Sequence, residues 1–176
     1  MTHPVLTAGR VAVVTGAAMG IGLAASKRFA ALGMRVGMAD VLIEELRSAR
    51  DEVARLAAGG DRDVLAVPTD VARPEHVESL KEAVYATFGE VGLLMNNAVT
   101  RTGGGVWDRL ENWEQALDVN FWGVVHGVRA FVPRMIAQGE PCLVVNTGSK
   151  QGITNPPGNL AYNVTKAALK AYTEGL

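Results

Sequence analysis

The chain has 176 residues, of which 48% are hydrophobic and 20% are charged, and its formal net charge is -1. This length suits one globular domain, so we expect residues 1–176 to form a single unit. Basic residues are neither in excess nor clustered, which disfavours nucleic-acid binding. The single cysteine, Cys142, excludes an internal disulfide, and no histidine–cysteine spacing predicts a metal site. We therefore expect a protein of the reducing cytoplasm.

An uncharged stretch over residues 11–26 follows Arg10 and resembles the apolar part of a secretory signal. It is too short to cross a bilayer, which requires about 20 apolar residues. Its glycines have a better explanation below, and no other stretch approaches membrane length. We expect no membrane association.

Short apolar runs alternate with longer helical patterns along the chain. The runs predict strands over residues 10–15, 34–39, 63–67, 91–95 and 142–146. Between them, apolar residues at helical spacing predict helices directly after the first strand, over 42–56, over 74–88 and over 111–138. Strands that alternate with helices predict a three-layer α/β fold, in which helices cover both faces of a doubly wound parallel sheet.

The helix predicted over residues 111–138 is apolar on more than one face. Its large apolar side chains are those of Phe121, Trp122, Val124, Val125, Val128, Phe131, Val132 and Met135. Either the helix is deeply buried or it forms a subunit interface. We favour the interface, because outer-layer helices normally keep one wet face, and we expect a homodimer or homotetramer through this helix.

Three glycines lie between the first strand and the helix that follows it, in the segment from Thr15 to Gly22. Such a turn lets backbone amides approach a pyrophosphate, which the helix N-terminus stabilises. Asp40 lies 18 residues after Gly22, at the end of the second strand. Its carboxylate suits ribose hydroxyls and repels a 2'-phosphate, so NAD is preferred over NADP. A purely structural turn is the alternative.

Tyr162 and Lys166 are four residues apart in a stretch that favours a helix, so they share one face. A tyrosine that acts as a base at neutral pH needs a nearby cation to favour its phenolate, and an ammonium about 4 Å away supplies energy of that order. The same spacing also occurs in ordinary surface pairs. Its meaning depends on the residues around it.

Further motifs accompany this pair. The turn at 15–22 reads Thr-Gly-x-x-x-Gly-x-Gly, Asp70-Val71 follows the third strand, Asn96-Asn97-Ala98 ends the fourth, and Ser149 precedes Tyr162 by 13 residues. With Asn120 in the long helix, the set resembles the short-chain dehydrogenase/reductase family, in its single-domain branch of NAD(P)-dependent alcohol dehydrogenases and ketone reductases. The resemblance covers essentially the whole chain and implies a Rossmann fold.

The resemblance also implies a role for each matching residue. Tyr162 is the general base in alcohol oxidation and the acid in ketone reduction, Ser149 holds the reacting oxygen, Lys166 favours the phenolate, and Asn120 keeps a water in a proton relay leading from Lys166. The cofactor-binding set is Gly16, Met19, Gly20, Ile21, Gly22, Asp40, Asp70, Val71, Asn97, Ala98, Tyr162 and Lys166. Ser149 as an ordinary turn residue and Asn120 as a residue that satisfies a helix kink are the alternatives.

Two features depart from the family pattern. Val99 stands where the family usually has glycine, and a β-branched residue restricts the backbone there. Related enzymes also continue past the Tyr-x-x-x-Lys helix, so we expect the sequence to be a fragment that ends before the last strands of the fold. The strand at 142–146 would then be an apolar edge, unless a partner covers it.

The leading hypothesis is an NAD-dependent oxidoreductase that transfers a hydride between NAD and a secondary alcohol or ketone. One alternative is an NAD-binding module with a non-catalytic or regulatory role, and another is a non-enzymatic assembly unit built on the long helix. The substrate is not predicted. Specificity is expected from the loops at 100–107 and 151–158, of which the first holds three consecutive glycines and is expected to be flexible.

Overall fold

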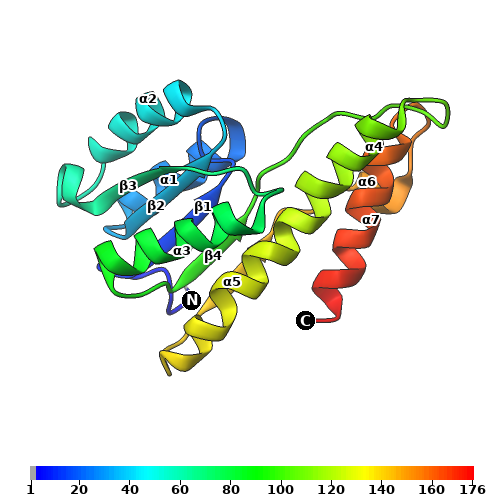
Figure 1. The fold of residues 1–176 in the computed structure, drawn as a ribbon. Coiled ribbons are helices and arrows are strands. Elements are labelled where there is room, and N and C mark those ends of the chain that lie inside the picture. The colour runs from blue at the N-terminus through cyan, green and yellow to red at the C-terminus, as the bar shows by residue number, and fades with distance from the viewer. Residues whose placement is uncertain (1–2) are drawn as a thin grey trace.

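The structure, a computed structural model, describes residues 3–176 and contains one five-stranded parallel sheet in the order β3-β2-β1-β4-β5 (Figure 1). The strands are β1 (Val11–Thr15), β2 (Arg35–Asp40), β3 (Val64–Pro68), β4 (Leu93–Asn96) and β5 (Leu143–Asn146). The chain adds β2 and β3 on one side of β1 and then crosses to add β4 and β5 on the other. The strand order therefore reverses between β1 and β4, which is where open α/β sheets bind their ligands.

Helices cover both faces of the sheet. In chain order they are α1 (Gly20–Ala31), α2 (Ile43–Ala54), η1 (Gly60–Asp63), α3 (Pro74–Phe88), α4 (Leu110–Leu117), η2 (Asp118–Trp122), α5 (Gly123–Ala137), α6 (Gln151–Thr154) and α7 (Leu160–Glu174). One face is covered by α1 and α2, and the opposite face by α3 and α5 (Figure 1). The predicted three-layer fold is confirmed.

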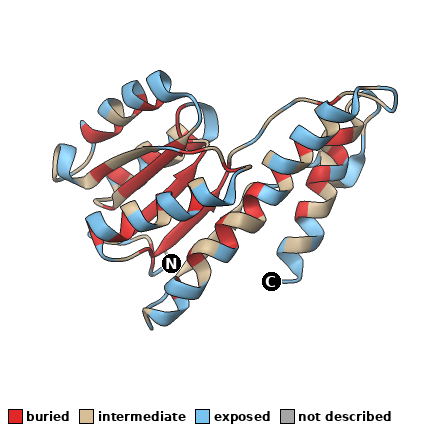
Figure 2. Cartoon of the chain, in the orientation of Figure 1, coloured by how far each residue is buried: buried red, intermediate tan, exposed pale blue. Residues whose placement is uncertain are grey.

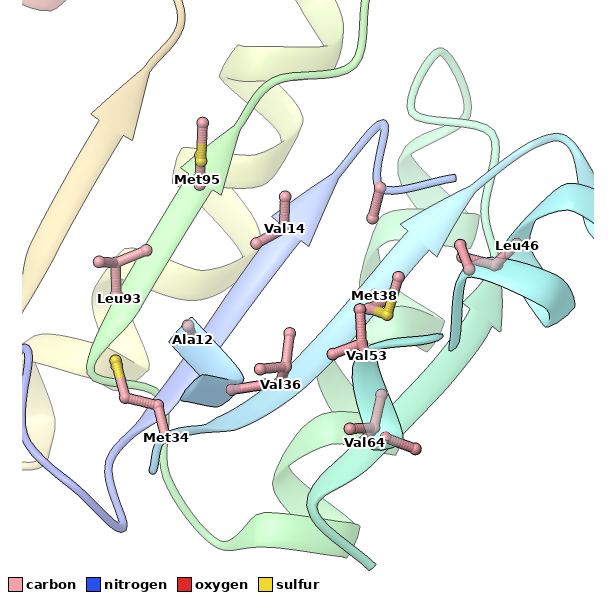
Figure 3. Close-up of a cluster of buried hydrophobic side chains, with 14 of the residues drawn as sticks. Ala12, Val14, Met34, Val36, Met38, Leu46, Val53, Val64, Leu93 and Met95 are labelled. Carbon is pink, nitrogen blue, oxygen red and sulfur yellow. The ribbon is translucent and has the colours of Figure 1, made fainter. Parts of the chain in front are cut away.

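The two faces of the central strand supply two separate apolar cores. Ala12 and Val14 of β1 point into the core beneath α1 and α2, whereas Val11 and Val13 point into the core beneath α3 and α5. This alternation follows the two-residue period of a strand. Figure 3 shows the first core, and Figure 2 shows that the central strands are buried along their length. A rigid, doubly covered sheet thus fixes the carboxyl ends of the strands.

The helix predicted over 111–138 is interrupted. The structure divides it into α4 and α5, joined by η2, a π-helical turn that contains Asn120. Part of its second apolar face is covered by α7, because Val124 and Val128 pack against Leu169. Trp122 stays 48% exposed. Burial against the sheet and α7 accounts for Val124, Val128, Phe131 and Met135 of α5.

The strand β5 lies at the edge of the sheet and pairs with β4 alone within residues 3–176. All four of its residues are only half-buried. Among the described residues, no helix is both long and apolar enough to cross a bilayer.

Candidate active site

The turn after β1 is shaped by its glycines. Gly16 and Gly20 have φ angles of +65° and +56°, in the left-handed region that favours glycine. A Cβ atom on Gly22 would lie 2.0 Å from the carbonyl oxygen of Gly16, and one on Gly16 would lie 2.8 Å from the Cα atom of Ala98. The turn therefore closes on itself and on the segment after β4, which only glycine permits.

The helix α1 begins at this turn without a side-chain cap. Its N-cap residue is Met19, whose side chain accepts no hydrogen bond. The first amides of a helix carry a partial positive charge and need an acceptor. Because Gly16, Met19, Gly20 and Ile21 line the same cavity, these amides suit the phosphate oxygens of a dinucleotide.

Asn97 ties this turn to β4. Its side-chain amide donates to the carbonyl oxygens of Thr15 and Gly16, at 3.1 and 3.2 Å. The Thr15 hydroxyl in turn accepts the backbone N–H groups of Asn97 and Ala98. Asn97 and Ala98 line the cavity as predicted, and the bonds of Asn97 also hold the glycine turn in place. Val99 lines the cavity too and is 48% exposed.

Asp40 lies at the end of β2, where the sequence placed it. One carboxylate oxygen accepts the N–H of Ala18 at 2.9 Å, and the other accepts the N–H of Leu42 at 3.1 Å. A carboxylate has about four acceptor positions, so two remain for ribose hydroxyls. The neighbouring Val41 and Leu42 line the cavity with apolar side chains. Within residues 3–176 the cationic residues of the lining, Arg101 and Lys166, belong to other segments of the chain.

One large cavity joins these residues. Its volume is about 910 Å³, within the size range of cofactor sites. It contains every residue of the predicted cofactor-binding set except Gly22, which is buried under the turn. Asp70 and Val71, after β3, complete the far wall. The donors, the acidic acceptor and the volume fit a nicotinamide dinucleotide.

Tyr162 and Lys166 stand on one face of α7, and both line the large cavity. The Nζ atom of Lys166 lies 5.7 Å from the centre of the Tyr162 ring. It donates to the carbonyl oxygen of Thr147 at 2.7 Å, and the residue is 3% exposed. Burial lowers the pKa of Lys166 from 10.5 to about 8. No carboxylate pairs with this ammonium within residues 3–176, so it lies close to the phenol without a competing anion.

A second, smaller cavity of about 270 Å³ lies on the other side of Tyr162. It is lined by Arg101, Ser149, Gln151, Asn159 and Tyr162. The Ser149 hydroxyl oxygen accepts the backbone N–H of Gln151 at 3.2 Å, which leaves its proton available for donation. Tyr162 therefore stands where the two cavities meet, with Lys166 on the large side and Ser149 on the small side.

The side chain of Asn120 does not line either cavity. It is fully buried in η2, where its oxygen accepts the N–H of Thr100 at 2.8 Å. Its amide donates to the Thr100 carbonyl at 3.0 Å and to the Thr165 hydroxyl at 3.3 Å. Asn120 thus holds the loop after β4 against α7, next to Lys166. The structure brings Tyr162, Lys166 and Ser149 together and keeps the carboxamide of Asn120 behind them.

Sequence reasoning did not single out Thr147, Asn159 or Arg101. Thr147 follows β5, and the rule that ligand-binding residues follow parallel strands could have found it. Arg101 falls inside a loop named only as a whole, and Asn159 lies one residue beyond the second loop. Their placement depends on how the loops dock on α7, which local sequence does not encode.

Comparisons with known proteins show which family and which fold this chain shares. A family described as short chain dehydrogenase matches residues 10–176. A 1-deoxy-11-beta-hydroxypentalenate dehydrogenase of Streptomyces arenae is 40% identical over 170 residues, which are 95% of this chain and 59% of that protein. A Burkholderia phymatum short chain dehydrogenase/reductase, solved in complex with NAD, matches with a TM-score of 0.92 and 39% identity. The match covers 99% of this chain and 60% of the Burkholderia chain.

Another similar structure is that of a metagenomic short-chain oxidoreductase in complex with NADP, which matches with a TM-score of 0.88 and 29% identity. This match covers 97% of the present chain and 76% of the metagenomic chain. Similar structures thus hold either nicotinamide cofactor. The chain spans about 60% of the length of the curated relative and of the NAD-bound structure.

Proposed function

Because the chain belongs to the short-chain dehydrogenase/reductase family, we propose that the protein is an NAD-dependent oxidoreductase that interconverts a secondary alcohol and a ketone. The observation that carries this proposal is the position of Tyr162 at the junction of the two cavities, between Lys166 and Ser149. One cavity has the size and donors for the cofactor, and the other has room for the reacting group of a small substrate.

The cofactor is assigned to the large cavity. The amides at Gly16, Met19, Gly20 and Ile21 would bind the pyrophosphate, and Gly22 allows the turn to close. Asp40 would bind the adenosine ribose, Asp70 and Val71 the adenine, and Asn97, Ala98, Tyr162 and Lys166 the nicotinamide half. When bound, the nicotinamide ring accepts or supplies the hydride.

The proton chemistry belongs to α7 and to the segment after β5. The Oη atom of Tyr162 takes the hydroxyl proton of the alcohol, or returns it to the ketone oxygen in the reverse direction. The Ser149 hydroxyl donates to the same oxygen and holds it within reach. The buried ammonium of Lys166 favours the phenolate of Tyr162. Asn120 supports a proton relay leading from Lys166 by fixing η2 and Thr165 beside it.

The preference for NAD over NADP rests on Asp40. A 2'-phosphate placed on the ribose would face a carboxylate, and the lining segment 40–42 holds no lysine or arginine that could offset the repulsion. Val41 and Leu42, which follow Asp40 and line the same cavity, are apolar and add no positive charge. These residues support NAD as the working cofactor.

The remaining parts of the proposal concern the whole protein. We assign residues 1–176 to one catalytic domain that acts on a small molecule, without nucleic acid or membrane partners. The half-exposed Trp122 supports a homodimer or homotetramer through the helix around 111–138. The single cysteine supports a reducing, cytoplasmic location.

The test is to incubate the full-length protein with NAD and a panel of secondary alcohols and to record NADH absorbance. Turnover of any alcohol supports the proposal. NAD binding without turnover of any alcohol or ketone would favour the alternative, a non-catalytic or regulatory NAD-binding module.

A further inference from the structure

Arg101 lines both cavities, a position that it shares with Tyr162. The other side chains around the small cavity, those of Ser149, Gln151 and Asn159, are polar and uncharged. The guanidinium is therefore the single cation of that lining, and no carboxylate of the described chain stands there with it. The local potential favours a negatively charged guest.

The guanidinium of Arg101 is free of protein contacts of two kinds in the described part of the chain. Within residues 3–176 it forms neither an ion pair nor a side-chain hydrogen bond. Of the acidic residues in the same region, Asp108 accepts the N–H of Gly104 and Glu111 pairs with Arg109 at 3.3 Å. Glu114 and Asp118 line the large cavity with Arg101 but not the small one, and within residues 3–176 neither forms an ion pair with it. Arg101 is also exposed, so an incoming anion meets it without first displacing a protein carboxylate.

The segment that carries Arg101 is anchored on both sides. Before it, Thr100 is held through its N–H and its carbonyl by Asn120. After it, Gly103 is buried with a φ of +89°, and a Cβ there would lie 2.7 Å from the Cβ of Ala161. The carbonyl of Gly104 then accepts the N–H of Leu160 at 2.8 Å. Gly103 thus lets the loop pack closely against α7.

We propose that Arg101 determines specificity by binding a carboxylate of the substrate, so that the substrate class is a hydroxycarboxylate or the matching oxocarboxylate. The planar guanidinium fork matches a carboxylate with two parallel hydrogen bonds. Its position beside Tyr162 places such an anchor near the reacting carbon. This inference rests on the proposed function, because it presumes that the small cavity holds the substrate.

The experiment compares each acid with its uncharged ester. The full-length protein is assayed with NAD and hydroxycarboxylates in which two to five carbons separate the hydroxyl carbon from the carboxyl group, each paired with its methyl ester. We expect kcat/KM to favour at least one acid over its ester by about 10- to 100-fold, the range for a hydrogen bond to a charged group. Arg101→Met is expected to bring that ratio close to one by lowering kcat/KM for the acid.

Matched variants separate this role from general effects. Arg109→Met removes a neighbouring exposed cation that lines neither cavity, and it should leave the ratio unchanged. Arg101→Lys keeps the charge but not the fork, and it should retain part of the preference. Because the guanidinium is exposed, the preference should also weaken as salt is added.

Three results would overturn the inference: esters that react as well as acids in the wild type, a preference that survives Arg101→Met, or an Arg101→Met variant whose main defect is weaker NAD binding. The last result would assign the guanidinium to the cofactor phosphates. If neither acids nor esters react, the proposed function fails separately. Calorimetric titration of the acids into the NAD-loaded protein then decides the inference alone, since binding abolished by Arg101→Met supports it and undetectable binding to the wild type contradicts it.

Discussion

At the scale of single residues, Lys166 has the most unusual environment. Its ammonium is buried, bonded to the Thr147 carbonyl and unpaired with any carboxylate within residues 3–176. Desolvation disfavours the charged form, which is why its pKa falls to about 8. The burial of this charge lowers stability, and under the proposed function its role is to place a positive charge beside Tyr162.

The first prediction is a pH-dependent stability that Lys166→Met removes. Below pH 8 both folded and unfolded states hold the proton, so the burial penalty is complete. Between about pH 8 and 10.5 the unfolded state binds more protons, so the free energy of unfolding should rise with pH, by up to about 1.4 kcal/mol per unit. Urea unfolding of the wild type and the variant at pH 7, 8, 9 and 10 measures the difference. A wild-type curve parallel to that of the variant would contradict it.

The second prediction concerns Asp40. Asp40→Ala removes the acceptor proposed for the ribose and also releases the N–H of Ala18. We expect NAD affinity to fall about tenfold, and NADP affinity to change less or to improve, because the repulsion of the 2'-phosphate is gone. Fluorescence titration with both cofactors measures this. Glu44→Ala, an exposed change on the next helix, is the control. An unchanged ratio of the two affinities would assign the preference elsewhere.

Residues that directly follow strands could be predicted from the sequence, and those placed by loop packing could not. Asp40, Asp70 and Asn97 each end or follow an apolar run, and parallel strands bring such positions to one edge. Arg101 reaches the site because Asn120, 19 residues further along the chain, holds the residue before it. A contact between residues so far apart in the sequence produces no local sequence pattern from which it could be predicted.

At the scale of elements, the π-helical turn η2 was the main feature that the sequence did not reveal. The apolar spacing over 111–138 is compatible with one regular helix, and an inserted residue alters the spacing only locally. In the structure, this turn connects two other parts of the chain. It places Asn120 where its carboxamide bonds both Thr100 and Thr165, joining the loop after β4 to α7.

The third prediction follows from that junction. Asn120→Leu removes both bonds to Thr100 and leaves the half-buried backbone N–H and carbonyl of that residue unpaired. We expect a loss of about 2–4 kcal/mol in the free energy of unfolding and faster amide exchange over residues 100–105. Urea unfolding and hydrogen exchange measure the two effects. Arg129→Ala, exposed on α5, should change stability by less than about 0.5 kcal/mol. Unaltered exchange in the loop would disprove the anchoring role.

The fourth prediction concerns the turn between β1 and α1. In Gly22→Ala the new methyl group meets a backbone oxygen that cannot move aside, 2.0 Å away. We expect the turn to be displaced and NAD binding to fall below detection by calorimetry. Gly105→Ala is the matched control, since a Cβ there meets nothing within 4 Å. Normal NAD affinity in Gly22→Ala would mean that the turn does not form the phosphate site.

At the scale of the whole molecule, the architecture followed from alternation alone, because five apolar runs separated by helical patterns allow little besides a doubly wound parallel sheet. The second apolar face of the long helix was harder to interpret. A helix face covered by α7 and one covered by another subunit would have the same apolar composition. Only the tertiary structure shows that Val124 and Val128 pack against Leu169 of α7. The candidate active site likewise depends on the tertiary arrangement, since its two cavities share Arg101, in the loop after β4, and Tyr162, on α7.

The role proposed for Tyr162 is tested most directly by single-turnover hydride transfer in the Tyr162→Phe variant. The NAD-loaded full-length protein is mixed with an alcohol that the wild type oxidises, and NADH absorbance is recorded. Loss of the phenolic oxygen should slow transfer by about 10²- to 10⁴-fold, the usual contribution of a general base. NAD affinity should stay within about threefold, because the glycine turn and Asp40 are untouched. Transfer at the wild-type rate by Tyr162→Phe would show that Tyr162 is not the general base.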